Sequence, residues 1–136
     1  MKKLLLTALT TTFIAGCAMQ PEQEAAISMD QLIGQEWVVE DINNQGIIDS
    51  SRVTLNFTDE GRVAGEASCN RYFAGYSVDG QTLKIEQAAS TMMACPEALM
   101  TQERRFLDAL QGVHSLTIDN TGALVLTGDD SRILAR

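Results

Sequence analysis

Hydrophobic and polar residues alternate in several short stretches of the chain from Val53 onward. Val53, Leu55 and Phe57 alternate with polar side chains, and Leu83 and Ile85 repeat the same two-residue period. This period places one face of a strand against a core and the other toward solvent. Similar short runs occur at residues 116–118, 124–126 and 133–134. The pattern predicts a domain built mainly from short β-strands.

Turn residues separate these stretches. Glycine or asparagine, which accept the positive φ that tight hairpins need, occurs in each of four gaps. The gaps are residues 59–61, 79–80, 120–122 and 128–130. Short strands in hairpin order must close on themselves or pack together to remove their exposed edges. We therefore expect a small antiparallel β-barrel of about six to eight strands.

Residues 96–111 break the β pattern and predict one amphipathic helix. Pro96 suits a first helical turn, and Glu97 complements the positive end of the helix dipole. Apolar residues then recur at three- and four-residue spacing up to Gly112. We expect the apolar stripe to cover one end or face of the sheet. The opposite, solvated side is expected to carry Gln102, Arg104, Arg105 and Asp108.

The start of the chain has the features of a targeting segment. Two lysines precede an uncharged run over residues 4–15 that is too short to cross a bilayer. The run ends in Ile14-Ala15-Gly16-Cys17, which resembles the lipobox of bacterial lipoproteins. We expect residues 1–16 to be a signal peptide, residues 17–29 a lipidated Cys17 with a flexible tether, and residues 30–136 the domain. The alternative is an ordinary signal peptide cleaved between Ala15 and Gly16, which leaves Cys17 as a free thiol.

Lipidation would determine the location of the protein. Each buried CH₂ contributes about 0.8 kcal/mol, so two or more acyl chains hold a protein stably on a membrane. Ala18 follows Cys17, whereas lipoproteins retained at the inner membrane typically have Asp there. We therefore expect an outer-membrane protein facing the periplasm. Ten Lys and Arg against 18 Asp and Glu give a net charge of −8, the wrong sign for a nucleic-acid partner.

Cys69 and Cys95 are the remaining cysteines. In an oxidising compartment such a pair tends to form a disulfide. Closing this loop would stabilise the domain by roughly 3.5 kcal/mol. A reversible redox pair is an alternative, although the C-x-x-C spacing that lowers a thiol pKa is missing. A cysteine nucleophile with His114 as its base is a second alternative.

Metal and cofactor chemistry has few candidate residues. Once Cys17 is lipidated, Cys69, Cys95 and His114 are one ligand short of a closed zinc site. The acidic turns at Asp119 and Asp129-Asp130 lack the spacing of a calcium-binding loop. Phosphate-loop, dinucleotide and serine-hydrolase motifs do not occur in the sequence. We expect no metal and no cofactor.

Paired carboxylates are the other candidates for catalysis. Glu36, Glu40 and Asp41 lie close together in the sequence and could act as an acid and a base. Carboxylates near the end of a strand are more typical of a solvated surface. We therefore expect the protein not to be an enzyme.

Four segments resemble the META/HslJ-like domain family of bacterial envelope proteins. They are Leu32-x-Gly34-x-x-Trp37, Cys69-Asn70-Arg71-Tyr72-Phe73, Ser90-Thr91-Met92-Met93-Ala94-Cys95 and Glu103-x-x-Phe106-Leu107-x-x-Leu110. The resemblance covers nearly all of residues 32–134. It implies a barrel of lipocalin-like topology with one helix. One departure is Ser68, which occupies a position where the family usually has glycine.

The functional implication of this resemblance is broad. Members are associated with the heat-shock response and with resistance to aminocoumarin antibiotics such as novobiocin. The family supplies no reaction and no catalytic residues. We therefore expect a non-enzymatic lipoprotein that binds a protein or envelope component. A small-ligand carrier that uses the barrel interior and a thiol redox protein that uses Cys69 and Cys95 are the alternatives.

Asn70, Arg71, Tyr72 and Thr91 form a candidate recognition patch. In the functional interpretation, Arg71 makes forked hydrogen bonds to a carboxylate or phosphate. In the structural interpretation, which we favour, Asn70 satisfies backbone groups at a bend, Phe73 belongs to the core and Arg71 pairs with an acid. Trp37 is likewise expected in the core rather than against a ligand.

Overall fold

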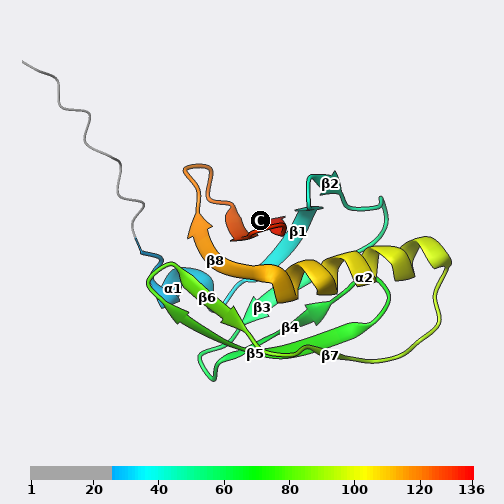
Figure 1. The fold of residues 1–136 in the computed structure, drawn as a ribbon, viewed down its shortest axis with the longest axis horizontal. Coiled ribbons are helices and arrows are strands. Elements are labelled where there is room, and N and C mark those ends of the chain that lie inside the picture. Colours follow the sequence, from blue (N-terminus) through cyan, green and yellow to red (C-terminus); the bar gives the residue numbers. More distant parts are fainter. Residues whose placement is uncertain (1–25) are drawn as a thin grey trace, which may run out of the picture.

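The computed structural model describes residues 26–136. The expected signal peptide, the lipidation site at Cys17 and the first part of the expected tether lie outside the described residues. The described part of the chain is mainly β-structure with one long helix (Figure 1). The prediction of a small antiparallel barrel with one amphipathic helix is confirmed.

Twelve elements follow one another along the described chain. The helices are α1 (Met29–Leu32) and α2 (Glu97–Gly112). The strands are β1 (Glu36–Ile42), β2 (Gln45–Gly46), β3 (Thr54–Phe57), β4 (Arg62–Glu66), β5 (Arg71–Asp79), β6 (Thr82–Ile85), β7 (Ala89–Ser90), β8 (Val113–Ile118), β9 (Leu124–Gly128) and β10 (Arg132–Ala135).

Eight of these strands form a closed up-and-down barrel. Their order is β1, β3, β4, β5, β6, β8, β9 and β10, and each pairs antiparallel with the next. Pairing between β10 and β1, with Val39 opposite Ala135, closes the ring. The two-residue strands β2 and β7 lie outside the ring, against β1 and β5 respectively. Closure removes the exposed edges that an open sheet of this size would present.

Glycine serves two different purposes in the hairpins. Gly61, Gly80 and Gly122 have φ values of 75°, 63° and 83°, as expected for residues in tight turns. Gly128 instead allows the end of β9 to lie close to the junction of α2 and β8. A Cβ atom there would lie 1.9 Å from the carbonyl oxygen of Gly112. The expected turn at residues 128–130 is present. Its glycine is required because a Cβ atom would not fit there, not because the turn needs a positive φ.

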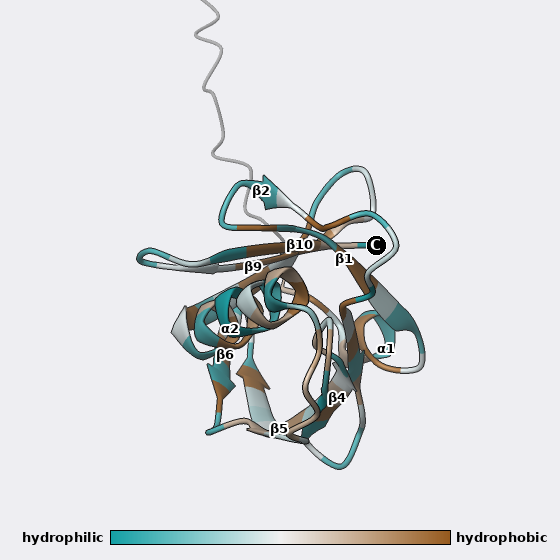
Figure 2. Ribbon diagram, turned by 90° about the vertical axis from the view of Figure 1, so that its right-hand side faces the viewer, coloured by the Kyte–Doolittle hydropathy of each residue, from teal (hydrophilic) through white to brown (hydrophobic). Residues whose placement is uncertain are grey.

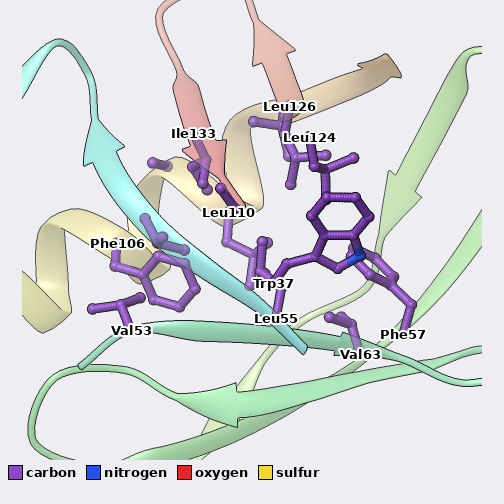
Figure 3. Packing of buried hydrophobic residues seen from close by; sticks show 14 of the residues in the cluster. Trp37, Val53, Leu55, Phe57, Val63, Phe106, Leu110, Leu124, Leu126 and Ile133 are labelled. Atoms are coloured by element: carbon purple, nitrogen blue, oxygen red, sulfur yellow. The ribbon is translucent and has the colours of Figure 1, made fainter. Parts of the chain in front are cut away.

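Side chains fill the interior of the barrel. Trp37 and Phe57 lie side by side from neighbouring strands, and Phe106 and Leu110 extend from α2 into the same core (Figure 3). The indole Nε1 of Trp37 donates a hydrogen bond to the carbonyl of Leu32, 3.0 Å away. The predicted place of Trp37 in the core is thus confirmed.

Helix α2 crosses one side of the barrel (Figures 1 and 2). Phe106, Ala109 and Leu110 are buried against the core, as the apolar stripe predicts. The expectation for Gln102 is wrong, because this side chain is fully buried rather than solvated. Its Oε1 accepts the backbone N–H of Ile48 at 2.8 Å, so burial is compensated by hydrogen bonding.

Candidate functional site

A disulfide between Cys69 and Cys95 joins the two most family-like motifs. The Cα atoms of the two cysteines are 5.9 Å apart. Cys69 precedes β5, and Cys95 lies between β7 and α2. The bond therefore ties the segment that leads into α2 to the start of β5. Neither sulfur is a free thiol in this structure.

The side chain of Asn70 connects three segments of this region. Its Oδ1 accepts hydrogen bonds from the hydroxyl of Thr91, at 2.9 Å, and from the backbone N–H of Met93, at 2.6 Å. Its Nδ2 donates to the carbonyl of Met93 at 3.3 Å and to Glu103 Oε1 at 2.8 Å. Asn70 is buried, so each of these bonds replaces a bond to water. The structural interpretation of Asn70, that it satisfies backbone groups at a bend, agrees with this geometry.

Glu103 completes this cluster from α2. Its Oε2 accepts the backbone N–H groups of Asn70, at 2.6 Å, and Cys69, at 3.2 Å. The carboxylate is buried and is satisfied by hydrogen bonds from amides. A buried carboxylate with several donors holds the donors in place. Sequence analysis missed this role, because position 103 only continued the spacing of the apolar stripe.

Ser68 adopts a backbone conformation that favours glycine. Its φ is 93°, in the region where a side chain causes strain. The departure from the family's glycine at this position therefore has a structural consequence. The Ser68 hydroxyl accepts a hydrogen bond from Gln102 Nε2 at 3.0 Å, and the same nitrogen donates to Ser51 at 2.7 Å. Ser68 thus uses its hydroxyl in the buried polar contacts of α2.

Tyr72 lies inside the barrel. Its ring packs edge-on against Phe106, with ring centroids 5.2 Å apart. Its hydroxyl donates a hydrogen bond to the carbonyl of Thr54 at 2.7 Å. Burial raises the pKa of Tyr72 well above its ordinary value. These contacts make Tyr72 a structural residue of the core.

The four residues of the predicted recognition patch do not share one surface. Along β5, successive side chains point to opposite faces, so Tyr72 points inward while Arg71 and Phe73 point outward. Asn70 is also buried, which leaves Arg71 and Thr91 exposed. The patch prediction grouped consecutive residues and ignored this alternation.

The same alternation corrects the expectation for Phe73. Phe73 is 52% exposed and is not part of the core. The guanidinium of Arg62 on β4 lies over its ring, 5.6 Å from the centroid. The expected ion pair of Arg71 with an acid is not found among residues 26–136. Two further exposed apolar residues, Met92 and Met93, follow Thr91.

The acidic candidates bind separate partners. Glu36 pairs with Arg52, and Glu40 pairs with Arg136. Asp41 accepts the backbone N–H of Asn44 at 2.8 Å. These three carboxylates therefore form no acid–base pair with one another.

The remaining ionisable candidates lie in the β8–β10 hairpins. His114 Nε2 is 3.2 Å from Asp129 Oδ1, and both side chains are exposed. Asp119 accepts hydrogen bonds from Thr121 and Ala123, and these bonds lower its pKa. Within residues 26–136, no group of three or more His, Cys, Asp or Glu side chains is arranged to hold a metal ion. No helix in the same range is long and apolar enough to cross a membrane.

Two hollows lie at the described surface. One of about 480 Å³ lies between the first half of α2 and Ile48, and Arg105 lines it. A second, of about 450 Å³, lies beside α1 and is lined partly by Trp37. Both are shallow and open to solvent.

The fold and its braced loops define a small closed antiparallel β-barrel with one helix packed on it. The chain belongs to the META domain family, since the family model for the META domain matches residues 30–136. The fold also resembles the NMR structure of a protein from Burkholderia xenovorans, with a TM-score of 0.66 and 19% identity over 93% of this chain and 96% of that chain. A second NMR structure has a TM-score of 0.63 and 19% identity, and the match covers 81% of this chain and 94% of that chain. A search of curated proteins found no match.

Proposed function

We propose that this protein is a lipoprotein of the outer membrane, facing the periplasm, that acts by binding a protein or envelope component. The observation that carries the proposal is the filled barrel. Trp37, Phe57 and Leu83 occupy the interior together with Phe106 and Leu110 from the helix. Side chains therefore take the space that a ligand would need in a carrier of this size. Binding at the outer surface is the role that this geometry supports best.

The chemistry of the candidate residues also favours binding over catalysis. Asn70, Tyr72 and Glu103 direct their polar atoms at the protein's own backbone and side chains. The pairing of Cys69 with Cys95 uses both thiols that the redox and nucleophile alternatives need. The anchor at Cys17 remains a proposal from the sequence, as does the contribution to stress or novobiocin-type antibiotic tolerance.

Cells that lack the protein provide the functional test. The strain would be complemented with the full chain, with Cys17→Ser, or with an empty vector, and its growth would be measured at high temperature and with novobiocin. We expect the full chain to restore tolerance and Cys17→Ser to fail at a matched protein level. Equal tolerance in all three strains would contradict the stress role.

Anchoring is tested separately by intact mass. We expect protein extracted from membranes to carry three acyl chains and to show no alkylation of Cys69 or Cys95 before reduction. An unlipidated mass, with the chain in the soluble fraction, would contradict the anchor. Rapid alkylation of the native protein would instead favour the thiol alternative.

A further inference from the structure

Phe73, Met92 and Met93 are exposed apolar residues, Phe73 near the start of β5 and the two methionines in the segment that runs beside it. Phe73 lies directly between Ala64 of β4 and Ala89 of β7 in the sheet register. Because both neighbours are small, the ring stands above the outer face of the sheet and is 52% exposed. We call this surface the Phe73 face and define it by Ala64, Arg71, Phe73, Ala89, Met92 and Met93.

The two methionines extend the Phe73 face beyond β7. The backbone N–H of Thr91 donates to the carbonyl of Arg71 at 3.0 Å, which places the following residues beside the start of β5. Met92 is 96% exposed and Met93 is 57% exposed. Met side chains adapt to partners of different shapes and are common at binding surfaces.

The backbone of the methionine segment is held in place by Asn70 and by the disulfide. Asn70 binds both the N–H and the carbonyl of Met93, and the Cys69–Cys95 disulfide holds the same segment. A partner therefore meets a surface whose backbone is already ordered. Binding to such a surface costs less conformational entropy than binding to a loop that must first be ordered.

The charges around Phe73 indicate the chemistry of a partner. Arg71 points outward two residues before Phe73, and its guanidinium has no ion-pair partner among residues 26–136. The acid opposite it, Glu66, lies 3.6 Å from Arg52 instead. Arg62 adds a second positive charge over the Phe73 ring. The carboxylate of Glu86 lies over Gly75, the residue paired with Arg62 in the sheet, and partly offsets this charge. An unpaired arginine beside an apolar ring favours a carboxylate next to an apolar side chain.

We propose that the Phe73 face binds an acidic segment of a partner protein, with an apolar side chain on Phe73 and a carboxylate on Arg71. This inference rests on the proposed function and names its surface and the chemistry of its partner. A second copy fits less well, because a symmetric contact through this face would bring four arginines into one interface, Arg62 and Arg71 from each copy. An anionic membrane fits less well too. Its attraction is about 1 kcal/mol per basic residue, and only Arg71 on the face and Arg62 beside it are available in a chain of net charge −8.

Photo-crosslinking in cells tests the proposal with the full, membrane-processed chain. A benzoylphenylalanine probe would replace Phe73 in one variant. Matched probes would replace Ser77, which is exposed further along β5, and Asp108, which is exposed on α2. We expect a protein crosslink at position 73 that is absent at the two control positions. The crosslinked peptide, identified by mass spectrometry, should contain Asp or Glu beside an apolar residue.

Charge reversal then tests whether Arg71 recognises that peptide. Arg71→Glu should lower the crosslinking yield about tenfold, which corresponds to the loss of one charge-assisted hydrogen bond. Replacing the acidic residue of the identified peptide by Lys should restore the yield with Arg71→Glu. Unchanged thermal unfolding of the variants would show that the fold is intact. An undiminished yield with Arg71→Glu would overturn the proposal.

The other outcomes separate this inference from the proposed function. Protein crosslinks only at position 77 or 108 would overturn the role of the Phe73 face and leave partner binding in place. Crosslinks from position 73 to lipid, or to a second copy of the chain, would also overturn it. A lack of protein crosslinks at all three positions would contradict partner binding through any of these surfaces.

Discussion

The carboxylate of Glu103 accepts hydrogen bonds from both the backbone amide and the side-chain amide of Asn70. One oxygen accepts the backbone N–H of Asn70 at 2.6 Å, and the other accepts its side-chain Nδ2 at 2.8 Å. The two residues are 33 positions apart in the sequence, one on α2 and one before β5. Because Asn70 in turn binds Thr91 and Met93, this pair holds the helix, the start of β5 and the exposed methionine segment in one arrangement.

Glu103→Ala is expected to destabilise the protein by about 3 kcal/mol. The substitution leaves the N–H groups of Cys69 and Asn70 without their acceptor, and a lost hydrogen bond to a buried charged group costs about 1.5–3 kcal/mol. Urea unfolding followed by circular dichroism measures the change. Loss of the bond should also weaken protection of the Asn70 and Met93 amides from hydrogen exchange.

Asp108→Ala is the matched control, because Asp108 is exposed on the same helix. Its effect should stay within about 0.5 kcal/mol. Glu103→Gln keeps the shape but presents an amide NH₂ to a site that contains only donors, so we expect it to destabilise as well. Wild-type stability in both Glu103 variants would contradict a bracing role for this residue.

Replacing both Cys69 and Cys95 by Ser should destabilise the protein by roughly 3.5 kcal/mol, the chain-entropy estimate for a disulfide with a sequence separation of 26. Thermal unfolding with and without reductant measures this effect. Reductant should lower the melting temperature of the wild type and leave the double variant unchanged. If the double variant complements a deletion strain fully at permissive temperature, the disulfide is structural; loss of function at wild-type protein levels would support a thiol activity instead.

Ser68 offers a direct measure of backbone strain. Ser68→Gly relieves the strain at φ 93°, and Ser68→Ala retains the strain, while both remove the hydroxyl that Gln102 uses. We expect the Gly variant to be more stable than the Ala variant by about 1 kcal/mol. Thermal or urea unfolding of the two variants makes the comparison. An Ala variant as stable as the Gly variant would show that the loop relaxes without cost.

Local patterns predicted the parts of the fold that follow local rules. Two-residue alternation identified the strands around Leu55, Leu83 and Leu126, and the glycine-containing gaps identified the hairpins between them. Strands β1, β4 and β5 escaped prediction, as did the two-residue strands β2 and β7. In β5, Arg71–Asp79, aromatic and glycine residues interrupt the apolar alternation, and barrel closure determines its two faces. The short helix α1 has too few residues to give a periodic signal.

In the candidate site, too, sequence patterns failed where contacts between distant segments decide the position of a side chain. The cysteine pair follows from composition and compartment, but the positions of Gln102 and Glu103 depend on what the helix packs against. Polar residues on a helix are normally solvated, and these two are buried because their partners approach from segments more than 30 positions away. Phe73 was misplaced for a related reason, since the register of β5 against β4 and β7 decides which side of the sheet it occupies.

Tyr72 is expected to make the folded protein less stable as the pH rises into the alkaline range. Its pKa in the folded protein is raised by burial, whereas in the unfolded chain it is near the ordinary value of 10.0. Above that pH the unfolded chain loses this proton and the folded protein keeps it, so rising pH favours unfolding. The stability linked to Tyr72 is therefore fully present below pH 10 and falls by up to about 1.4 kcal/mol per pH unit above it.

Tyr72→Phe tests this dependence. The variant should lose about 1 kcal/mol at neutral pH, because the hydrogen bond to the carbonyl of Thr54 is missing. Between pH 10 and 11, however, its stability should fall less steeply than that of the wild type. Urea unfolding at several pH values measures both effects. Tyr76→Phe is the control, since Tyr76 is less deeply buried and should contribute a smaller alkaline loss. Parallel pH profiles for the wild type and Tyr72→Phe would mean that the Tyr72 hydroxyl is accessible enough to ionise in the folded barrel.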